Sequence, residues 1–185
     1  MTRGITVRRV PSAQLTGAEV ERLRALLDEA FNDPDPGERF SEDDWQHALG
    51  GIHFLADEDG RIVSHASVVE RDIRVDGAPL RTGYVEAVAT EPAGQGRGIG
   101  SAVMREVAAY LAEAFELGML GTGSQGFYER LGWFIWRGPS SVRLADGERP
   151  TPEEDGYIMA MRTPSTPLLD PDAPISCEWR PGDVW

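Results

Sequence analysis

Hydrophobic residues follow two periods along this chain, that of a strand and that of a helix. Residues 5–10, ITVRRV, are rich in β-branched side chains and predict a strand. Thr16 and Glu19 then form a capping-box pair, which is typical of a helix start. The apolar residues that follow recur at intervals of three and four, so they predict a first helix with one buried face. These residues are Val20, Leu23, Leu26, Leu27, Ala30 and Phe31.

A second capping pair and a run of β-rich segments occupy the next sixty residues. Ser41 and Asp44 predict a short helix, which carries Trp45 and Leu49 and ends at the glycines that follow. Four β-rich segments come next: IHFLA, RIVSHASVVE, RDIRV and LRTGYVEAVAT. The short turns DEDG and DGAP join them in pairs, so they predict a meander of about four antiparallel strands. Its last strand runs from about Leu80 to Thr90.

A glycine-rich loop, EPAGQGRGIG, leads into a long amphipathic helix whose apolar positions step by four from Ile99 to Leu111. Beyond it LGMLG predicts a strand and GFYERLGW a short helix that ends at Gly132. WFIW, SVRLA, YIMAM and SCEWR predict further strands. No repeat or composition break divides residues 1–185, so we expect one α/β domain with a mixed sheet flanked by helices.

The glycine-rich loop raises the question of what approaches its backbone. No lysine follows Gly100, which excludes a P-loop, and alternating glycines do not have the spacing of a dinucleotide fingerprint. Glycines at a helix start still favour a phosphate, because the N–H groups of the first turn lack intrahelical acceptors. A flexible turn before a surface helix explains the glycines alone equally well.

Charge and composition narrow the class of partner. The chain has 31 acidic and 18 basic residues, a net charge of -13 that argues against nucleic acid and favours a cationic ligand. An acidic surface that serves solubility alone is the alternative. Apolar runs fall short of the roughly 18 residues of a membrane span, and residues 1–15 lack a signal-peptide core, so we expect a cytoplasmic protein without a membrane partner. Cys177, the single cysteine, is expected to be a packed thiol, and no cluster has metal-ligand spacing.

Gln95, Gly98 and Gly100 between a strand and a long helix resemble motif A of the GCN5-related N-acetyltransferases (GNAT). More of the chain is similar to one branch, the aminoglycoside 2'-N-acetyltransferases, in the segments DWQHALGGIH, GYVEAVAT, FYERLGWFIWRGP, TPEEDG and CEWRPGDVW. The resemblance implies the GNAT fold, a mostly antiparallel twisted sheet flanked by helices with the coenzyme at its splayed strands. It further implies acetyl transfer from acetyl-CoA to the 2'-amino group of an antibiotic, antibiotic resistance, and often a homodimer.

The coenzyme contacts that the resemblance implies are backbone contacts of the glycine loop with pyrophosphate and of the preceding strand end with the pantetheine arm. They fall on Val88, Ala89, Gln95, Gly96, Arg97, Gly98, Ile99, Gly100 and Ser101. Acetyl-CoA is thus the expected cosubstrate, and no metal is expected.

Two residues are candidates for the proton transfers of acetylation. Glu86 interrupts an apolar strand, where an unpaired buried carboxylate is costly; an exposed strand face or an arginine partner is the alternative. The resemblance implies that Glu86 contacts the substrate and is the base, acting through ordered water. Tyr128 lies where the family places a tyrosine beside the thioester sulfur, which implies protonation of the leaving thiolate. Packing with Phe127 and Leu131 is the alternative.

Substrate contacts are implied mainly near the end of the sequence. Its last eight residues, EWRPGDVW, hold two tryptophans and an aspartate, and frayed tails rarely carry so much to bury. The resemblance assigns the ammonium groups of the antibiotic to Asp183 and to Trp185 with its α-carboxylate. A hydrophobic anchor is the alternative, which explains the tryptophans but not the aspartate. Glu154, in an acidic run, is a further candidate that a solvated turn explains equally well.

Two departures from the family pattern bear on the substrate. Arg39 occupies a position where the family commonly has an acidic residue, and Asp33 and Asp35 are possible replacements in the same loop. The stretch before Tyr128 is shorter than in the family, and Thr122 offers a hydroxyl for a lost serine contact. Two other functions stay open: acetylation of another amine, such as a cell-wall amino sugar, a polyamine or a metabolite, or non-catalytic binding of acetyl-CoA or sequestration of the antibiotic.

Overall fold

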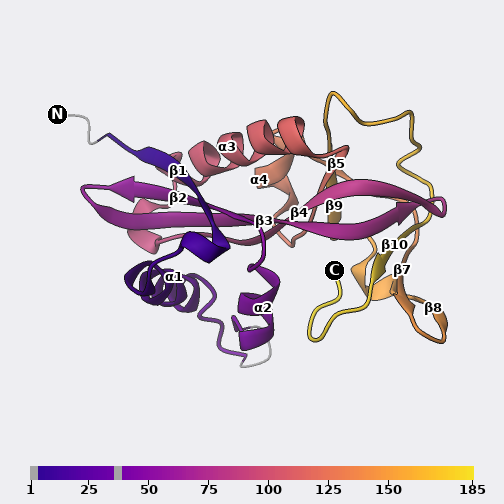
Figure 1. The fold of residues 1–185 in the computed structure, drawn as a ribbon, viewed down its shortest axis with the longest axis horizontal. Helices are drawn as coiled ribbons and strands as arrows, with labels where there is room; N and C mark the ends of the chain where they lie inside the picture. Colours follow the sequence, from indigo (N-terminus) through magenta and orange to yellow (C-terminus); the bar gives the residue numbers. More distant parts are fainter. Residues whose placement is uncertain (1–3, 36–38) are drawn as a thin grey trace. The chain divides into compact units, whose positions relative to one another are not determined.

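The computed structural model of the protein describes residues 4–35 and 39–185. The chain forms two compact units, each built from two separate stretches. Unit 1 comprises Met1–Val69 and Val85–Val107, and unit 2 comprises Glu70–Tyr84 and Ala108–Trp185. Three long elements contribute residues to both units (Figure 1). They are β3 (Arg61–Val75), β4 (Ala78–Thr90) and α3 (Ile99–Ala114).

Unit 1 confirms the two predicted capping boxes. The Thr16 hydroxyl accepts the N–H of Glu19 at the start of α1, and Ser41 and Asp44 make the same reciprocal contacts at the start of α2. In this unit β1 pairs with β2, and β2 pairs with β3, both antiparallel. The elements of this unit before β3 are β1 (Thr6–Pro11), η1 (Ser12–Gln14), α1 (Gly17–Ala30), α2 (Glu42–His47) and β2 (Ile52–Glu58).

The core of unit 1 is the apolar face that the helical spacing predicts. Leu23, Leu26 and Leu27 of α1 are fully buried and pack with Trp45 of α2 and Leu55 of β2. Burying side chains of this size is worth roughly 1.5–3 kcal/mol each. The cluster also includes Ala89 of β4, so it packs both helices against the strand that leads into the glycine loop.

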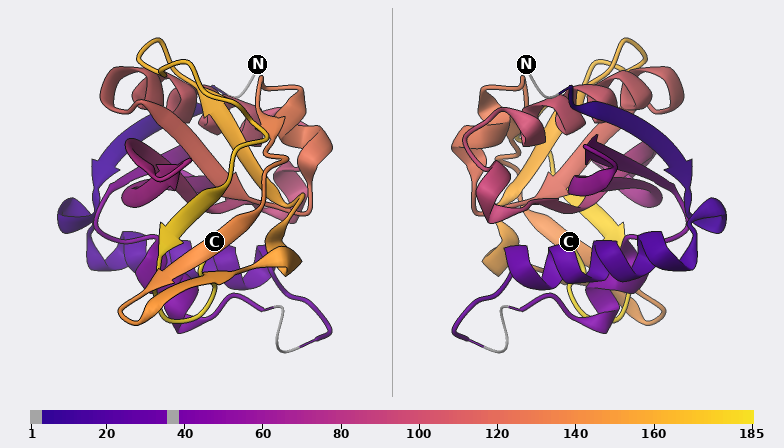
Figure 2. Two further views of the ribbon diagram at one scale, coloured as in Figure 1. Left: turned by 90° about the vertical axis from the view of Figure 1, so that its right-hand side faces the viewer. Right: turned by 90° about the vertical axis from the view of Figure 1, so that its left-hand side faces the viewer.

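Unit 2 is built on a mixed sheet, as predicted. Its strands lie in the order β6-β9-β5-β4-β3-β10-β7-β8, with β5 parallel to β4 and β10 parallel to β7. The views of Figure 2 show β7 and β10 side by side. The other elements of this unit are β5 (Leu117–Gly121), α4 (Gln125–Glu129), β6 (Phe134–Ile135), β7 (Ser140–Leu144), β8 (Gly147–Pro150), η4 (Pro152–Glu154), β9 (Ile158–Arg162) and β10 (Ile175–Glu178).

Two strand predictions were wrong. RIVSHASVVE and RDIRV form one strand, β3, so the meander has three strands instead of four. Arg71 looks like a break in the sequence, but its buried guanidinium pairs with Glu178, so the strand continues through it. The sequence also gave no sign of β8, because all four of its residues are exposed and show no apolar alternation.

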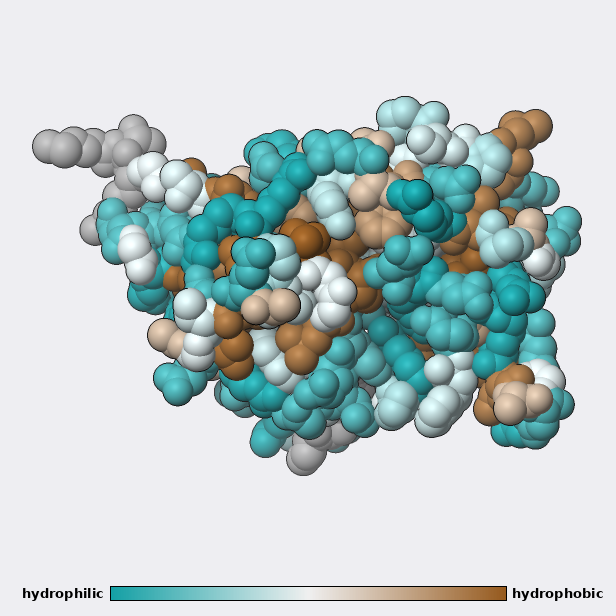
Figure 3. Space-filling view, viewed as in Figure 1, coloured by the Kyte–Doolittle hydropathy of each residue, from teal (hydrophilic) through white to brown (hydrophobic). Residues whose placement is uncertain are grey.

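Polar residues cover most of the face shown in Figure 3, in keeping with the net charge of -13. In the described part of the chain, no helix is long and apolar enough to cross a membrane.

A buried pair of histidines lies in the sheet of unit 1. His53 of β2 and His65 of β3 are fully buried, and their ring nitrogens Nδ1 and Nε2 lie 2.9 Å apart. Burial lowers the pKa of His53 to about 4 and that of His65 to about 3, with the charge of His53 adding to the second effect. Both imidazoles are therefore neutral near pH 7.

This pair predicts a loss of stability in mild acid. The unfolded chain takes up protons near pH 6.5, whereas the folded histidines do so only near pH 4 and pH 3. Their neutral state therefore costs nothing above pH 6.5, and stability is lost as pH falls below it. We expect the free energy of unfolding, from urea titrations, to fall by roughly 3–4 kcal/mol between pH 7 and pH 5.

The matched control is His47→Gln, which removes the third histidine of the chain and leaves the buried pair in place. We expect this variant to lose nearly as much free energy of unfolding between pH 7 and pH 5 as the wild-type protein. A free energy of unfolding that is constant from pH 7 to pH 5 would contradict the prediction.

Candidate active site

The glycine loop begins the long helix with exposed backbone. Gly96 and Gly98 have φ angles of 74° and 80°, a left-handed conformation that a side chain would strain. The helical ladder of α3 starts with the bond from the Ala102 N–H to the Gly98 carbonyl. The N–H groups of Ile99, Gly100 and Ser101 therefore precede the ladder, as the first turn of any helix does. Because the Ile99 side chain is buried, only its main chain is available to a ligand.

Ion pairs of two buried carboxylates in unit 1 hold the loop in place. At its first residue, the carboxylate of Glu91 accepts hydrogen bonds from Arg61 at 2.6 and 2.8 Å and from Arg22 at 3.2 Å. Within it, Arg97 donates to both carboxylate oxygens of Glu58, at 2.5 and 3.2 Å, and these bonds raise the pKa of its guanidinium. The Arg97 side chain thus fastens the loop to β2, and its predicted coenzyme contact stays a prediction.

Gln95 closes the loop on the strand before it. Its side-chain amide donates to the carbonyl of Thr90, the last residue of β4, at 3.3 Å. The same strand carries Val88, which is half-buried, and Ala89, which is buried. The residues for which the resemblance implies coenzyme contacts therefore form one continuous stretch of unit 1, from the end of β4 into the first turn of α3.

Glu86 lies where the β4 backbone leaves the extended conformation. The next residue, Ala87, has a φ of +51°, which is uncommon for a residue other than glycine. Glu86 is half-buried, so its carboxylate is neither in the dry core nor on a fully exposed strand face. Its predicted role as a base stays a prediction.

Side chains of β3 hold the β4 backbone on both sides of Ala87. Ser67 Oγ donates to the Glu86 carbonyl at 3.4 Å, and Ser64 Oγ donates to the Ala89 carbonyl at 2.7 Å. His65 Nδ1 donates to the Ala87 carbonyl at 2.7 Å. Neither His65 nor His53 was predicted from the sequence to be near the site. Their signal was a histidine within each of two neighbouring apolar strands, but only the fold shows that they meet.

Tyr128 lies in α4 of unit 2 and is buried among aromatic rings. Phe127 and Trp133 contact it edge-on, with ring centroids 4.9 and 6.1 Å away. Burial raises the pKa of the Tyr128 phenol to about 12, so it keeps its proton across the physiological range. Its hydroxyl makes no hydrogen bond to any residue that the structure describes. The ring of Tyr128 is packed, as the alternative interpretation predicts, and its hydroxyl also keeps a proton that it could donate.

The loop before α4 is shaped by Thr122. Its hydroxyl oxygen accepts the N–H of Ser124 at 2.9 Å, and its own N–H donates to the carbonyl of Tyr157. The short loop is thus ordered by its own hydroxyl. The substrate contact predicted for Thr122 stays a prediction.

Trp185 is buried, as the anchor interpretation predicts. Its indole N–H donates to the Thr151 hydroxyl at 3.0 Å, and its main-chain oxygen accepts from Arg180 at 3.4 Å. Arg180 also donates to the main-chain oxygen of Asp183, at 2.7 Å. One guanidinium therefore folds the segment into a turn that leaves the Asp183 carboxylate exposed.

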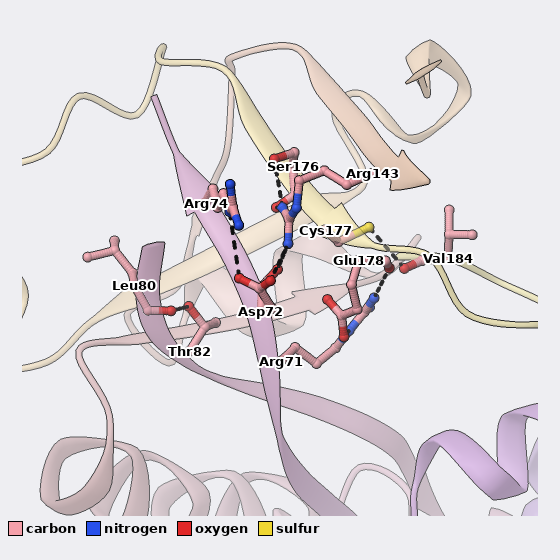
Figure 4. A network of polar contacts seen from close by, with 10 residues as sticks. All are labelled: Arg71, Asp72, Arg74, Leu80, Thr82, Arg143, Ser176, Cys177, Glu178 and Val184. Carbon is pink, nitrogen blue, oxygen red and sulfur yellow. Dashed lines mark hydrogen bonds and ion pairs between the residues drawn. The ribbon is translucent and has the colours of Figure 1, made fainter. Parts of the chain in front are cut away.

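The strand before this turn is fastened to β3 within unit 2. Figure 4 shows Arg71 against Glu178, to which it donates at the carboxylate (3.0 Å) and at the carbonyl (3.1 Å). It also shows Cys177, whose thiol donates to the Val184 carbonyl at 3.3 Å. Cys177 is fully buried, and burial raises the pKa of its thiol to about 11, which confirms the expectation of a packed thiol.

Glu154 and Asp183 form an acidic cluster in unit 2. The pKa of Glu154 is raised, first by burial and then by the charge of Asp183, so the two carboxylates lie close enough to repel each other. Neither makes an ion pair with any described residue. Asp155, the next residue of the same run, instead accepts hydrogen bonds from the Ser140 hydroxyl and N–H. The structure thus brings Glu154, Asp183 and Trp185 together, whereas Asp155 holds the backbone.

Asp35 and Arg39 belong to the acidic loop of unit 1, of which residues 36–38 lie outside the described part of the chain. The Asp35 N–H donates to the Asp33 carboxylate at 2.8 Å, and Arg39 Nε donates to the Asp33 carbonyl at 2.8 Å. The positive charge of Arg39 is therefore turned onto its own loop. The substrate contact predicted for Asp35 stays a prediction.

Comparisons with known proteins identify the family of the chain. A family model described as an acetyltransferase (GNAT) domain matches residues 13–135. An aminoglycoside 2'-N-acetyltransferase from Mycolicibacterium fortuitum is 39% identical over 184 residues, which cover 97% of this chain and 92% of that protein.

Solved structures share the fold at lower identity. The Escherichia coli GNAT family N-acetyltransferase YhbS in complex with CoA has a TM-score of 0.67 at 14% identity, covering 97% of this chain and 92% of that one. A GNAT family acetyltransferase from Brucella melitensis in complex with acetyl-CoA has a TM-score of 0.60 at 21% identity, covering 91% and 94%. The chain therefore belongs to the GNAT acetyltransferases, and within them to the aminoglycoside 2'-N-acetyltransferase family.

Proposed function

We propose that this protein transfers the acetyl group of acetyl-CoA to the 2'-amino group of aminoglycosides. The observation that carries the proposal is the 39% identity to an aminoglycoside 2'-N-acetyltransferase over 97% of the chain. Two features of the structure support it independently. The glycine loop offers backbone donors to a phosphate, and the acidic cluster of Glu154 and Asp183 offers unneutralised charge to a cation.

Acetyl-CoA fits the residues of the loop. Its pyrophosphate would accept hydrogen bonds from the N–H groups at the start of α3, and the glycines at 96 and 98 keep side chains away from that approach. Because Arg97 is occupied by Glu58, this recognition would depend on backbone donors more than on a free cation. The strand end at Val88 and Ala89 would contact the pantetheine arm through its main chain.

Glu86 is proposed as the base. An ammonium group has no lone pair, so the amine must lose a proton before its nitrogen can attack the thioester carbonyl. A half-buried carboxylate within an apolar strand can take that proton, directly or through a water molecule.

Tyr128 is proposed as the acid. When the new C–N bond forms and the C–S bond breaks, the leaving sulfur carries a negative charge and needs a proton. A phenol with a pKa of about 12 is fully protonated at neutral pH, and its hydroxyl is not engaged by any residue that the structure describes. Its proton is therefore available to the departing thiolate.

Glu154 and Asp183 are proposed to select a polycation. A bound ammonium group would relieve the repulsion between the two carboxylates through charge-assisted hydrogen bonds. A neutral sugar would leave both charges poorly paired, so it would be discriminated against.

The domain organisation and assembly are part of the same proposal. The GNAT family match spans residues 13–135 and so includes residues of both units, which supports one acetyltransferase domain over residues 1–185. A cytoplasmic location, a homodimer, and action without metal or nucleic acid stay predictions.

Acetylation of a different amine is the second candidate. The observation that favours it is Arg39, a basic residue at a position where the family commonly has an acidic one. Arg39 offers no negative charge to a polycation there, and its Nε donates to its own loop. A cell-wall amino sugar or a polyamine would then be the natural substrate, with antibiotics as incidental ones.

Release of thiol from acetyl-CoA by the purified protein tests the substrate. We expect turnover with tobramycin, which has a 2'-amino group, and none above background with kanamycin A, which has a 2'-hydroxyl group. The reason is that only the amine can attack at that position. Turnover with neither antibiotic, in a protein that binds acetyl-CoA, would reject the aminoglycoside and leave the second candidate.

Glu86→Gln tests the base, because it keeps the shape of the side chain and removes its proton affinity. We expect kcat/KM for tobramycin to fall by about 10²–10⁴, while the dissociation constant of coenzyme A changes less than about threefold. Glu21→Gln, an exposed position on α1, is the matched control and should change neither value. Equal losses of turnover and of coenzyme binding would indicate a structural role for Glu86 instead.

Tyr128→Phe tests the acid, because it removes the hydroxyl and keeps the ring packing. We expect kcat to fall by about 10–10² with little change in the KM for acetyl-CoA. Tyr110→Phe removes a hydroxyl elsewhere in the same unit and serves as the control. If Tyr128→Phe kept the wild-type kcat, the ring would serve packing only.

A further inference from the structure

Four residues of unit 1 form a continuous hydrogen-bonded chain that no step of the proposed reaction uses. The Ser12 hydroxyl lies 2.9 Å from His53 Nε2, and His53 Nδ1 lies 2.9 Å from His65 Nε2. His65 Nδ1 lies 2.7 Å from the carbonyl oxygen of Ala87. These hydrogen bonds run from the first residue of η1 through β2 and β3 to β4, where they reach the residue that follows Glu86.

The Ala87 carbonyl fixes the direction of every proton in this chain. A carbonyl oxygen only accepts, so the His65 proton must be on Nδ1, and Nε2 of the same neutral ring must accept. His53 must then donate from Nδ1, which leaves its Nε2 to accept from Ser12. Both imidazoles are neutral because burial lowers their pKa values. The neutral pair therefore has one arrangement of tautomers.

The Ser12 hydroxyl has a second possible acceptor besides His53. The two choices lead to different protonation of the histidines, so they can be distinguished by experiment. The Ser12 hydroxyl also lies 3.2 Å from the Gly51 carbonyl, while the Gly50 N–H donates to its oxygen at 3.0 Å. One hydroxyl proton can serve either His53 or Gly51. If it served Gly51, His53 Nε2 would have to donate, and the buried pair would need an extra proton.

Ala87, the last acceptor in this series of hydrogen bonds, has a strained backbone. Ala87 has a φ of +51° within a strand, a conformation that costs free energy for any residue with a Cβ atom and persists only when its surroundings enforce it. Because successive strand residues point to opposite faces, a left-handed residue changes the faces that its neighbours present. The direction of Glu86 relative to Val88 thus depends on Ala87.

We propose that His65, oriented by His53 and Ser12, is a positioning residue that keeps Ala87 in its left-handed conformation and thereby sets the direction of the Glu86 side chain. The inference rests on Glu86 as the base of the proposed function. Among the side chains that the structure describes, Ser67 donates to the Glu86 carbonyl and Ser64 to the Ala89 carbonyl, whereas His65 donates to the carbonyl of Ala87 itself.

A second-site rescue tests the positioning role. His65→Leu removes the donor, and we expect kcat/KM for tobramycin to fall at least about tenfold, mainly in kcat. Ala87→Gly removes the strain, because glycine adopts a positive φ readily. In the His65→Leu background it should restore activity to within about threefold of Ala87→Gly alone. His65→Asn, which keeps a donor near the position of Nδ1, should retain activity without a second change.

Ala66→Gly is the matched control for added backbone flexibility, since Ala66 is buried on β3 and has no positive φ. It should not rescue His65→Leu. Rescue by both glycines, or by neither, would overturn the proposal. If His65→Leu does not fold, folding becomes the readout: the proposal requires Ala87→Gly to restore folded protein and His65→Asn to fold by itself, and the failure of either overturns it.

Nitrogen-15 NMR of the histidine rings tests the chain without any assay of activity. At pH 7 both His53 and His65 should be neutral with the proton on Nδ1, which is the less common tautomer of free histidine. A proton on Nε2 of His65, or a charged ring, would overturn the inference.

The rescue and NMR experiments distinguish a failure of the positioning role from a failure of the proposed function. A wild-type protein that has the expected tautomers but acetylates no 2'-amino compound would reject the proposed function, and the rescue by Ala87→Gly would then be measured as the midpoint of urea unfolding. Correct activity together with the wrong tautomers, or with no rescue, would reject the positioning role alone.

Discussion

The left-handed conformation of Ala87 is the constraint around which β3 and β4 arrange their hydrogen bonds in unit 1. A regular strand would satisfy its carbonyls through the ladder, whereas around this residue β3 supplies side-chain donors from Ser64, His65 and Ser67. Buried polar groups of this kind are costly unless each one is paired. The hydrogen bonds that satisfy them therefore also specify where β4 leaves the extended conformation. The candidate base, Glu86, directly precedes that position.

Carboxylates are used in two contrasting ways in this protein. Glu58, Glu91 and Glu178 each face an arginine, and each pair fastens a loop or a strand. Glu154 and Asp183 instead make no ion pair among the described residues, and the charge of Asp183 helps to raise the pKa of Glu154. Charge that is neutralised within the fold stabilises a local contact, while charge left uncompensated is available to a cationic ligand.

Local patterns predicted most of the elements, because caps and spacing depend on neighbours in sequence. Thr16 with Glu19 and Ser41 with Asp44 marked two helix starts correctly, and the glycine loop marked a third. Long-range pairing could not be predicted in this way. Arg71 continues β3 only because Glu178 lies opposite, and His53 meets His65 only once two strands pair. The positive φ of Ala87 leaves no trace in its residue type. Of the candidate site, motif A and the terminal segment with Asp183 were predicted from the sequence, whereas the two buried histidines were not.

The buried cysteine has a consequence for a protein that works beside free coenzyme A. Each turnover of the proposed reaction releases a thiol, and oxidised coenzyme A could exchange with any reactive cysteine nearby. Cys177 is fully buried, its pKa is about 11, and its thiol hydrogen-bonds to Val184. Thiol–disulfide exchange requires an accessible thiolate. The single thiol of this chain is therefore inaccessible to thiol–disulfide exchange in the folded protein, and oxidised coenzyme A would not modify the segment that carries Asp183 and Trp185.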